Sequence, residues 1–180
     1  MGMNEVHLMF FVAVEDGVRT TEEAAAAVGY QVPDGGARRF LRGRWRSLEA
    51  TIYTESFEGH QLVSIGISAL TFFEIKHGEH PEISGPEFAD WFAETARELR
   101  TEIGMLPFRL HQNEPEWPPT IYEAVWFHEI GLLVDEYFSF LYLARGIPYE
   151  DWLGPEQRAL NKQGGVLICD ADEAHLWVGE

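Results

Sequence analysis

Histidine and carboxylate side chains gather in one short segment of this 180-residue chain. His77 and His80 are three residues apart, and Glu74 precedes His77 by the same interval. Imidazole nitrogens and carboxylate oxygens are ligands of divalent metals, so these three side chains could support metal-dependent hydrolysis. Gly78 and Pro81 predict a turn here, and the helical His-Glu-x-x-His pattern is absent. We therefore interpret both histidines as surface residues and predict no metal site.

A second candidate site lies in the apolar segment 121–144. His128 and Asp135 are seven residues apart, on one face if this segment is helical, and Glu129 adjoins His128. A buried histidine beside carboxylates can act as a general base or metal ligand, although it is more often part of a structural hydrogen-bonded pair. The sequence carries no phosphate-binding glycine loop, Gly-x-Ser-x-Gly motif or Cys/His zinc framework. The two histidine–carboxylate groups leave a small metal-dependent hydrolase as an alternative function. No cofactor is expected.

The most regular pattern of charge belongs to a helix predicted from Ser84 to Gly104. Ser84 stands three residues before Glu87, a capping-box pattern, and Pro86 suits the first turn. At about 100° per residue, one face of this helix carries an acidic stripe, with Trp91 beside it. The acidic stripe consists of Glu87, Asp90, Glu94, Glu98 and Glu102.

The acidic stripe supports two interpretations. Acidic side chains four residues apart repel one another by about 0.2 to 0.5 kcal/mol per pair in an isolated helix, and a cationic partner would relieve this repulsion. Trp91 favours a partner-binding role, because tryptophan is enriched at the centre of recognition patches. The other interpretation is a solvated face on which Arg97 offsets Glu94, with Trp91 packed against a neighbouring element.

Two further acidic groups lie outside this helix. Glu114, Glu116 and Trp117 stand in a loop with three prolines, and a stiff backbone lowers the entropy lost on binding. The alternative is a connector whose tryptophan covers the edge of the core. The acidic residues of 170–173 are interpreted as turn residues.

Charge is distributed unevenly along the chain. Residues 1–46 hold six acids and six bases, whereas residues 47–180 hold 24 acids and seven bases, which gives a net charge of −17. Such a charge repels nucleic acid and anionic membranes and favours a basic partner. Five arginines between positions 38 and 46, with Trp45, invite a phosphate or nucleic-acid interpretation. The overall charge instead favours internal ion pairs or a local anion site.

Composition favours a folded chain in a reducing compartment. The 46% hydrophobic content and 24 aromatic side chains can form the core of a single domain over 1–180. The single cysteine, Cys169, has apolar neighbours and is interpreted as a buried, inert thiol. We expect no secretory signal and no membrane span, because charged residues interrupt 121–144. The protein is therefore expected to be cytoplasmic.

Hydrophobic periodicity predicts both strands and helices. Strands are expected at Val6–Val14, 48–53, 63–69 and 106–111, with the second and third antiparallel, and a closing hairpin is expected to pair 166–169 with 174–178. Helices are expected over the Ala24–Ala27 run, capped by Thr20 or Thr21 and stopping at Gly29, and at 84–104 and 120–144, the last with a strand as the open alternative. This order predicts an α+β fold, with an antiparallel or mixed sheet packed against two or three helices.

The function that fits best is an acidic binding protein that neutralises a basic protein partner. By analogy of size and charge, a bacterial immunity protein that blocks a toxin domain would fit. The expected partner-binding residues are those of the acidic stripe, Trp91, and the loop residues Glu114, Glu116 and Trp117. A nucleic-acid mimic is a special case of this hypothesis. Two different functions stay open beside it: the metal-dependent hydrolase and a subunit of a larger assembly.

Overall fold

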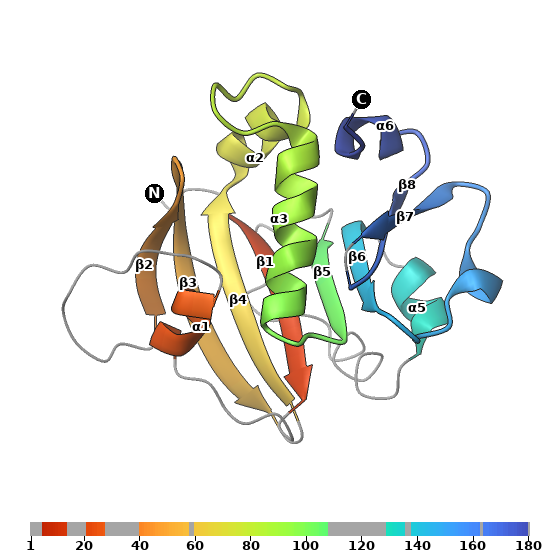
Figure 1. The fold of residues 1–180 in the computed structure, drawn as a ribbon, viewed down its shortest axis with the longest axis horizontal. Coiled ribbons are helices and arrows are strands. Elements are labelled where there is room, and N and C mark those ends of the chain that lie inside the picture. The colour runs from red at the N-terminus through yellow and green to blue at the C-terminus, as the bar shows by residue number, and fades with distance from the viewer. Residues whose placement is uncertain are drawn as a thin grey trace.

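The strands of the computed structural model form one eight-stranded sheet in which all neighbouring pairs are antiparallel (Figure 1). The structure describes residues 5–13, 21–27, 40–57, 60–107, 129–135, 138–162 and 164–179. The strand order is β2-β3-β4-β1-β5-β6-β8-β7. The strands are β1 (Glu5–Ala13), β2 (Phe40–Trp45), β3 (Leu48–Phe57), β4 (His60–Ser68), β5 (Ile103–Pro107), β6 (Phe138–Ala144), β7 (Gln157–Lys162) and β8 (Gly165–Asp170). The helices are α1 (Thr21–Ala27), α2 (Ala69–Lys76), α3 (Gly85–Glu98), α5 (Ile130–Asp135) and α6 (Ala174–Trp177), with a 3-10 turn η2 (Glu150–Trp152).

The first strand of the chain, β1, lies in the interior of the sheet. Leu8 and Phe10 pack into one core, whereas Met9 and Phe11 pack into the core on the opposite face. A strand buried on both faces has a continuous apolar run instead of a polar alternation, which explains the sequence of β1. It pairs with β4 over its whole length and with β5 through Met9, Phe10 and Phe11.

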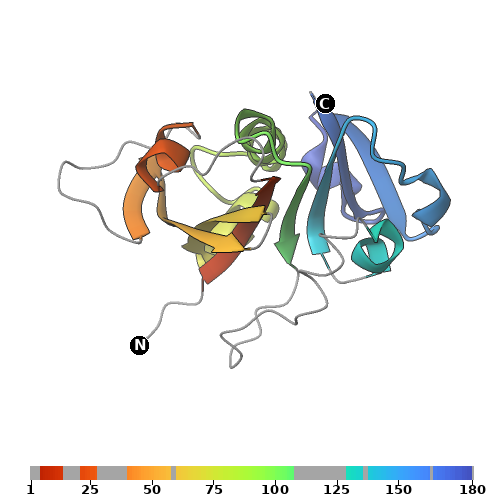
Figure 2. The same ribbon diagram turned by 90° about the horizontal axis from the view of Figure 1, so that it is seen from below.

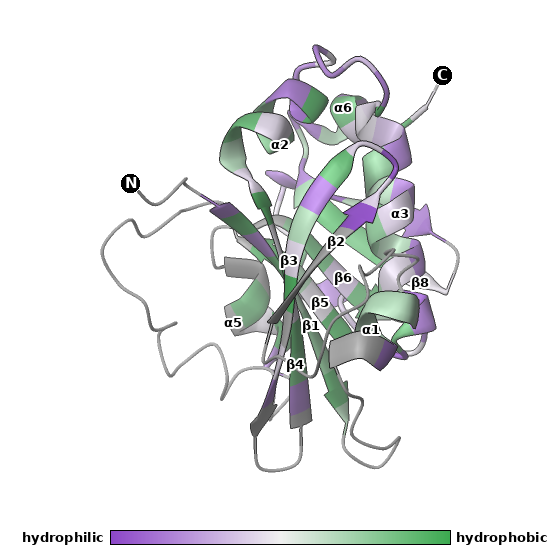
Figure 3. Ribbon diagram, turned by 90° about the vertical axis from the view of Figure 1, so that its left-hand side faces the viewer, coloured by the Kyte–Doolittle hydropathy of each residue, from purple (hydrophilic) through white to green (hydrophobic). Residues whose placement is uncertain are grey.

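Helices cover the two faces of the sheet unequally. The larger core combines strand residues with side chains from α1, α2, α3 and α6, among them Phe72, Phe92 and Trp177. The smaller core, on the other face, includes Ile130 and Leu133 of α5. Figures 2 and 3 show α3 and α5 on opposite sides of the strands. This arrangement confirms the predicted α+β fold with an antiparallel sheet.

Several predicted elements are confirmed in place. The period-two segments form β3 and β4, which pair antiparallel, and the alanine-rich segment forms α1. The capping box at the start of α3 is also present: the Ser84 hydroxyl accepts a hydrogen bond from the Glu87 backbone N–H, and the Glu87 carboxylate accepts one from the Ser84 backbone N–H. Side-chain chemistry within a few residues therefore sets the start of this helix.

The end of α3 differs from the prediction. The sequence predicts an end at Gly104, but the last helical residue is Glu98. Arg100 adopts a left-handed backbone with φ of 55°, and the Thr101 N–H donates to the Ala96 carbonyl oxygen at 2.8 Å. This is the hydrogen-bond pattern of a Schellman cap, here made without glycine. The chain then turns, and Gly104 belongs to β5.

The C-terminal half contains the largest corrections. Within the segment expected to be helical, residues 138–144 form strand β6, which is the alternative that periodicity left open. The expected closing hairpin is wrong: β8 pairs with β7, and residues 174–177 form α6. Strands β2 and β7 and helix α2 were not predicted from the sequence. No helix within the described ranges combines the length and the apolar character needed to cross a membrane.

Candidate functional site

Two members of the acidic stripe on α3 pair with bases from opposite ends of the sheet. Arg46, in the turn between β2 and β3, donates from Nη1 to Glu87 Oε1 at 2.9 Å. Lys162, at the end of β7, donates from Nζ to Asp90 Oδ1. Because β2 and β7 are the outermost strands among the described residues, these pairs tie α3 to both sides of the described sheet.

The C-terminal half of the stripe is paired within the helix. Arg97 Nη2 lies 3.4 Å from Glu94 Oε1 and 2.9 Å from Glu98 Oε1. Glu102 is not part of the helical stripe, because α3 ends at Glu98 and Glu102 lies in the bend before β5. Glu94 and Glu98 remain well exposed, at 62% and 50% of their side-chain area, so they contact both the arginine and solvent. The stripe is therefore a network of ion pairs rather than an uncompensated row of acids.

Trp91 is buried, which corrects its expected place in an exposed recognition patch. Only 5% of Trp91 is exposed. Its ring stacks on Trp45 of β2 with centroids 4.7 Å apart and an interplanar angle of 22°. The Arg46 guanidinium carbon lies 5.0 Å from the centroid of the Trp45 ring, within cation–π range. Trp91 thus packs against a neighbouring element, and the prediction of internal ion pairs among the arginines is confirmed for Arg46.

The ionised form of Glu87 is stabilised by three neighbouring donors. Its pKa is lowered from 4.5 to about 2, first by the hydrogen bond from the Ser84 backbone, then by the Arg46 side chain and the Ser84 hydroxyl. Each of these groups donates to the carboxylate and so favours its ionised form. Glu87 is therefore a structural anion that fixes the start of α3 and its contact with the β2–β3 turn.

The acidic residues near the C-terminus form a real electrostatic cluster. Burial raises the pKa of Asp170, and the negative charges of Glu173, Glu156 and Asp172 raise it further, while Lys76 opposes them. Lys76 of α2 donates to Glu173 just before α6, and the Lys76 side chain is only 9% exposed. The cluster therefore carries more negative charge than Lys76 can neutralise.

The histidine and carboxylate groups proposed for a metal do not assemble in the described part of the chain. No group of three or more His, Cys, Asp or Glu side chains that could hold a metal ion occurs there. His80 Nδ1 accepts backbone hydrogen bonds from Glu82 and Ile83, so this imidazole holds the loop before α3. The Phe73 and His77 rings stack within α2 and its C-cap. His128 lies outside the described residues, as do Glu114, Glu116 and Trp117.

A hydroxyl–imidazole–carboxylate row on the sheet was missed by the sequence analysis. Ser64 Oγ lies 3.4 Å from His7 Nδ1, and His7 Nε2 lies 3.8 Å from Glu5 Oε2. Burial lowers the pKa of His7 and the Glu5 charge opposes this effect. Ser64 is completely buried, so a substrate has no access to its hydroxyl. The row is a structural contact between β1 and β4. The sequence signal for it was the two-residue spacing of Glu5 and His7, which places both side chains on one face of a strand.

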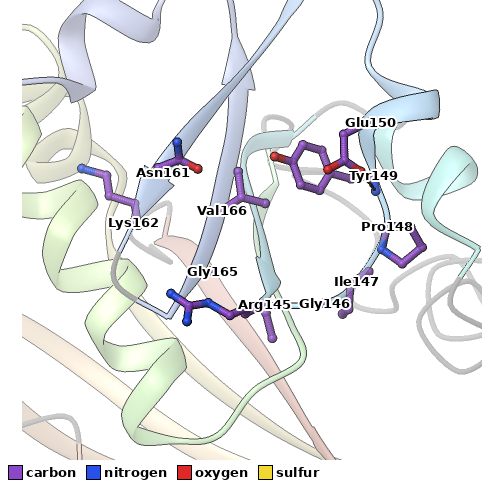
Figure 4. Close-up of a pocket in the computed structure, with 11 residues that line it drawn as sticks. Arg145, Gly146, Ile147, Pro148, Tyr149, Glu150, Asn161, Lys162, Gly165 and Val166 are labelled. Atoms are coloured by element: carbon purple, nitrogen blue, oxygen red, sulfur yellow. Dashed lines mark hydrogen bonds between the residues drawn. The ribbon is translucent and has the colours of Figure 1, made fainter.

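A pocket of about 530 Å³ opens between the loop after β6 and the β7–β8 hairpin. Figure 4 shows Tyr149 and Glu150 on one side of it, facing Asn161 and Lys162 across β8. Backbone N–H groups of Glu150 itself and Tyr149 lower the Glu150 pKa. Because Lys162 is paired with Asp90, its charge is already engaged at the rim of the pocket.

Six of the nine expected partner-binding residues lie in the described part of the chain, and they divide into three sets. Glu87, Asp90, Glu94 and Glu98 share the exposed face of α3, Glu102 lies beyond its end, and Trp91 is in the core. No family model, curated protein or solved structure matches this chain. A function for this chain is therefore inferred from the side chains on its surface.

Proposed function

We propose that this protein binds and neutralises a basic protein partner, in the manner of a bacterial immunity protein that blocks a toxin domain. The observation that carries the proposal is the surplus of exposed acidic side chains on a folded α+β body. The sequence has 30 acids against 13 bases, so acidic groups exceed basic groups by 17.

Several bases of the described structure already pair with acids of the same chain, so they do not neutralise the remaining acidic side chains. Arg46, Lys76, Arg97 and Lys162 all make ion pairs with acids of the same chain. Exposed acids are spread over several elements and loops, among them Glu49, Glu55, Glu79, Glu82, Asp151, Glu156 and Asp172. The negative electrostatic field of these side chains raises the encounter rate with a cationic protein by about 10- to 1000-fold at low salt.

The proposed compartment is the cytoplasm. Cys169 is the single cysteine of the chain, and its thiol is free and buried. A protein that holds a free thiol and lacks a partner cysteine suits a reducing environment. An inhibitor made there would meet a toxin domain in the cell that produces it or in the cell that the toxin enters.

A metal-dependent hydrolase remains the competing class. Its candidate groups were Glu74, His77 and His80 or His128, Glu129 and Asp135, and the described members do not form a metal cluster. A single tightly bound zinc ion, lost in His77→Ala or His128→Ala, would favour this alternative. A melting temperature that does not respond to zinc would count against it.

The proposed function is tested by capture from a lysate of the source organism at low salt, followed by calorimetry with each captured protein. We expect a one-to-one complex with a basic protein whose dissociation constant rises as salt is added. An affinity that is indifferent to salt, or the capture of acidic proteins alone, would overturn the proposal. Sedimentation of the protein alone over a concentration series separates an inhibitor from a subunit of a homomeric assembly.

A further inference from the structure

Helix α2 carries two of the four exposed large hydrophobic side chains in the described part of the chain. Its sequence is ALTFFEIK, and Leu70 and Phe73 are 69% and 50% exposed. Isolated exposed apolar residues are common, but two adjacent ones on a helix face mark a candidate interaction site. Figure 3 shows α2 at the end of the sheet, beside α6.

The exposed apolar face is additional to the face that holds α2 in the fold. Phe72 packs against Phe88 and Trp177, and Ile75 is completely buried. At about 100° per residue, Leu70, Phe73 and His77 lie on the opposite side of the helix. Folding therefore requires Phe72 and Ile75 but does not require the outward apolar side chains.

The charges around this face are acidic. Lys76, the one base in α2, points toward α6, where it pairs with Glu173. Glu74 shares the outward side of α2, and the exposed Glu79 and Glu82 follow in the next loop. The apolar pair thus has one carboxylate beside it on the helix and two more in the loop that follows, here called the acidic rim, and this combination suits a partner with both apolar and cationic side chains.

We infer that the partner of this protein docks on the outward face of α2 through an amphipathic basic segment, with Leu70 and Phe73 as apolar anchors. This inference rests on the proposed function and assigns it a surface. Apolar side chains of the partner bury Leu70 and Phe73, while its Lys or Arg side chains meet Glu74, Glu79 and Glu82. The electrostatic rim sets the rate of encounter, and the apolar centre sets the rate of dissociation.

The acidic stripe of α3 is a weaker docking surface for the same partner. Its carboxylates already contact Arg46, Lys162 and Arg97, so a cationic partner must displace those bases or share their acids. Exchange of one ion pair for another at an exposed site brings little free energy. Glu79 and Glu82 make no ion pair within the described structure. A cationic partner can therefore bind them without displacing another base.

The test uses the full-length protein and a synthetic helical peptide of leucine and lysine with all leucines on one face. A scrambled peptide of the same composition is the control for charge alone. We expect Phe73→Ser with Leu70→Ser to weaken binding of the amphipathic peptide by at least about tenfold, because anchors of this kind dominate interface energy. Trp152→Ser is the matched control, since Trp152 is 55% exposed but lies on another element. We expect it to leave the affinity unchanged.

A second pair of variants tests the acidic rim. Glu79→Lys with Glu82→Lys should weaken peptide binding and reduce its salt dependence, whereas Glu94→Lys with Glu98→Lys on α3 should change both less. Peptide binding that is salt-sensitive but indifferent to Leu70 and Phe73 overturns the assignment to α2 and leaves the proposed function standing. Absence of peptide binding also overturns it, and the lysate experiment then decides the proposed function separately. Self-association that the Phe73→Ser variant abolishes identifies a second copy as the occupant, which also overturns the inference.

Discussion

Trp45 and Trp91 stack on each other with ring centroids 4.7 Å apart, which joins an outermost strand of the described sheet to the longest of the described helices. Trp45 is the last residue of β2, and Trp91 lies in the middle of α3. The next residue, Arg46, adds its guanidinium to the Trp45 ring and its ion pair to Glu87. One aromatic stack and one ion pair therefore hold the β2–β3 turn against the helix.

Replacement of Trp91 tests its place in the core. We expect Trp91→Ala to lower the free energy of unfolding by about 3 to 5 kcal/mol, because a large buried side chain leaves a cavity. Leu70→Ala is the control, since Leu70 is 69% exposed and surface substitutions stay within about 0.5 kcal/mol. Urea unfolding followed by circular dichroism gives both values. Equal losses in the two variants would contradict the burial of Trp91.

The low pKa of Glu87 predicts an acid-dependent contribution to stability. The folded value of about 2 lies below the ordinary value of 4.5, so the contribution is complete above pH 4.5 and is lost as the pH falls toward 2. Wild type should therefore exceed Glu87→Gln in melting temperature at neutral pH, with a difference that shrinks in acid. Arg46→Gln should raise the Glu87 pKa, as measured by an NMR titration of the side-chain carboxylate. A Glu87 pKa near 4.5 in the wild type would refute the cap geometry.

Ionisation of Asp170 has the opposite effect on the stability of the fold. Its pKa is raised by burial, then by the charge of Glu173, so ionisation of Asp170 lowers the stability of the fold at neutral pH. This loss disappears as the pH falls below the ordinary value of 3.8, where Asp170 is protonated in both states. Asp170→Asn should thus melt at a higher temperature than wild type at pH 7 and match it in acid. Asp151→Asn, an exposed change in η2, is the control. An equal rise in melting temperature in this variant would show that the Asp170 effect comes only from the change in net charge.

Cys169 should be unreactive in the folded protein. Burial raises its pKa to about 11, and the charges of Asp170 and Glu173 act in the same direction. Because the thiolate is the reactive species, we expect almost no reaction with a thiol reagent at pH 8 until denaturant is added. The measured rate should follow the fraction of unfolded protein. Rapid reaction of the native protein would show that β8 opens locally.

Local chemistry was sufficient to predict part of the fold. The capping box and the 3.6-residue repeat determine the start and the faces of α3, and period-two alternation determines β3 and β4. These signals involve residues a few positions apart. The end of α3 was harder to predict, because Arg100 takes the left-handed conformation that usually indicates glycine.

Other features depend on partners distant in the sequence. The burial of Trp91 depends on Trp45, and the charge balance of the acidic stripe depends on Arg46 and Lys162. Strand β6 contributes to both cores through Phe140 and Leu141, so its apolar run has no alternation that would distinguish it from a buried helix. The exposure of Leu70 and Phe73 was likewise invisible in a sequence where apolar residues predict burial.

The interior position of β1 has a consequence for synthesis on the ribosome. β1 ends at Ala13, but its neighbours come later, since β4 ends at Ser68 and β5 begins at Ile103. At about 5 to 20 residues per second, roughly 3 to 11 seconds pass between completion of β1 and completion of β4. During this interval the apolar strand β1 emerges from the ribosome with both edges unpaired, as a nascent segment that chaperones can bind. Slower translation before β4 would therefore lower the yield of folded protein without any change in its final stability.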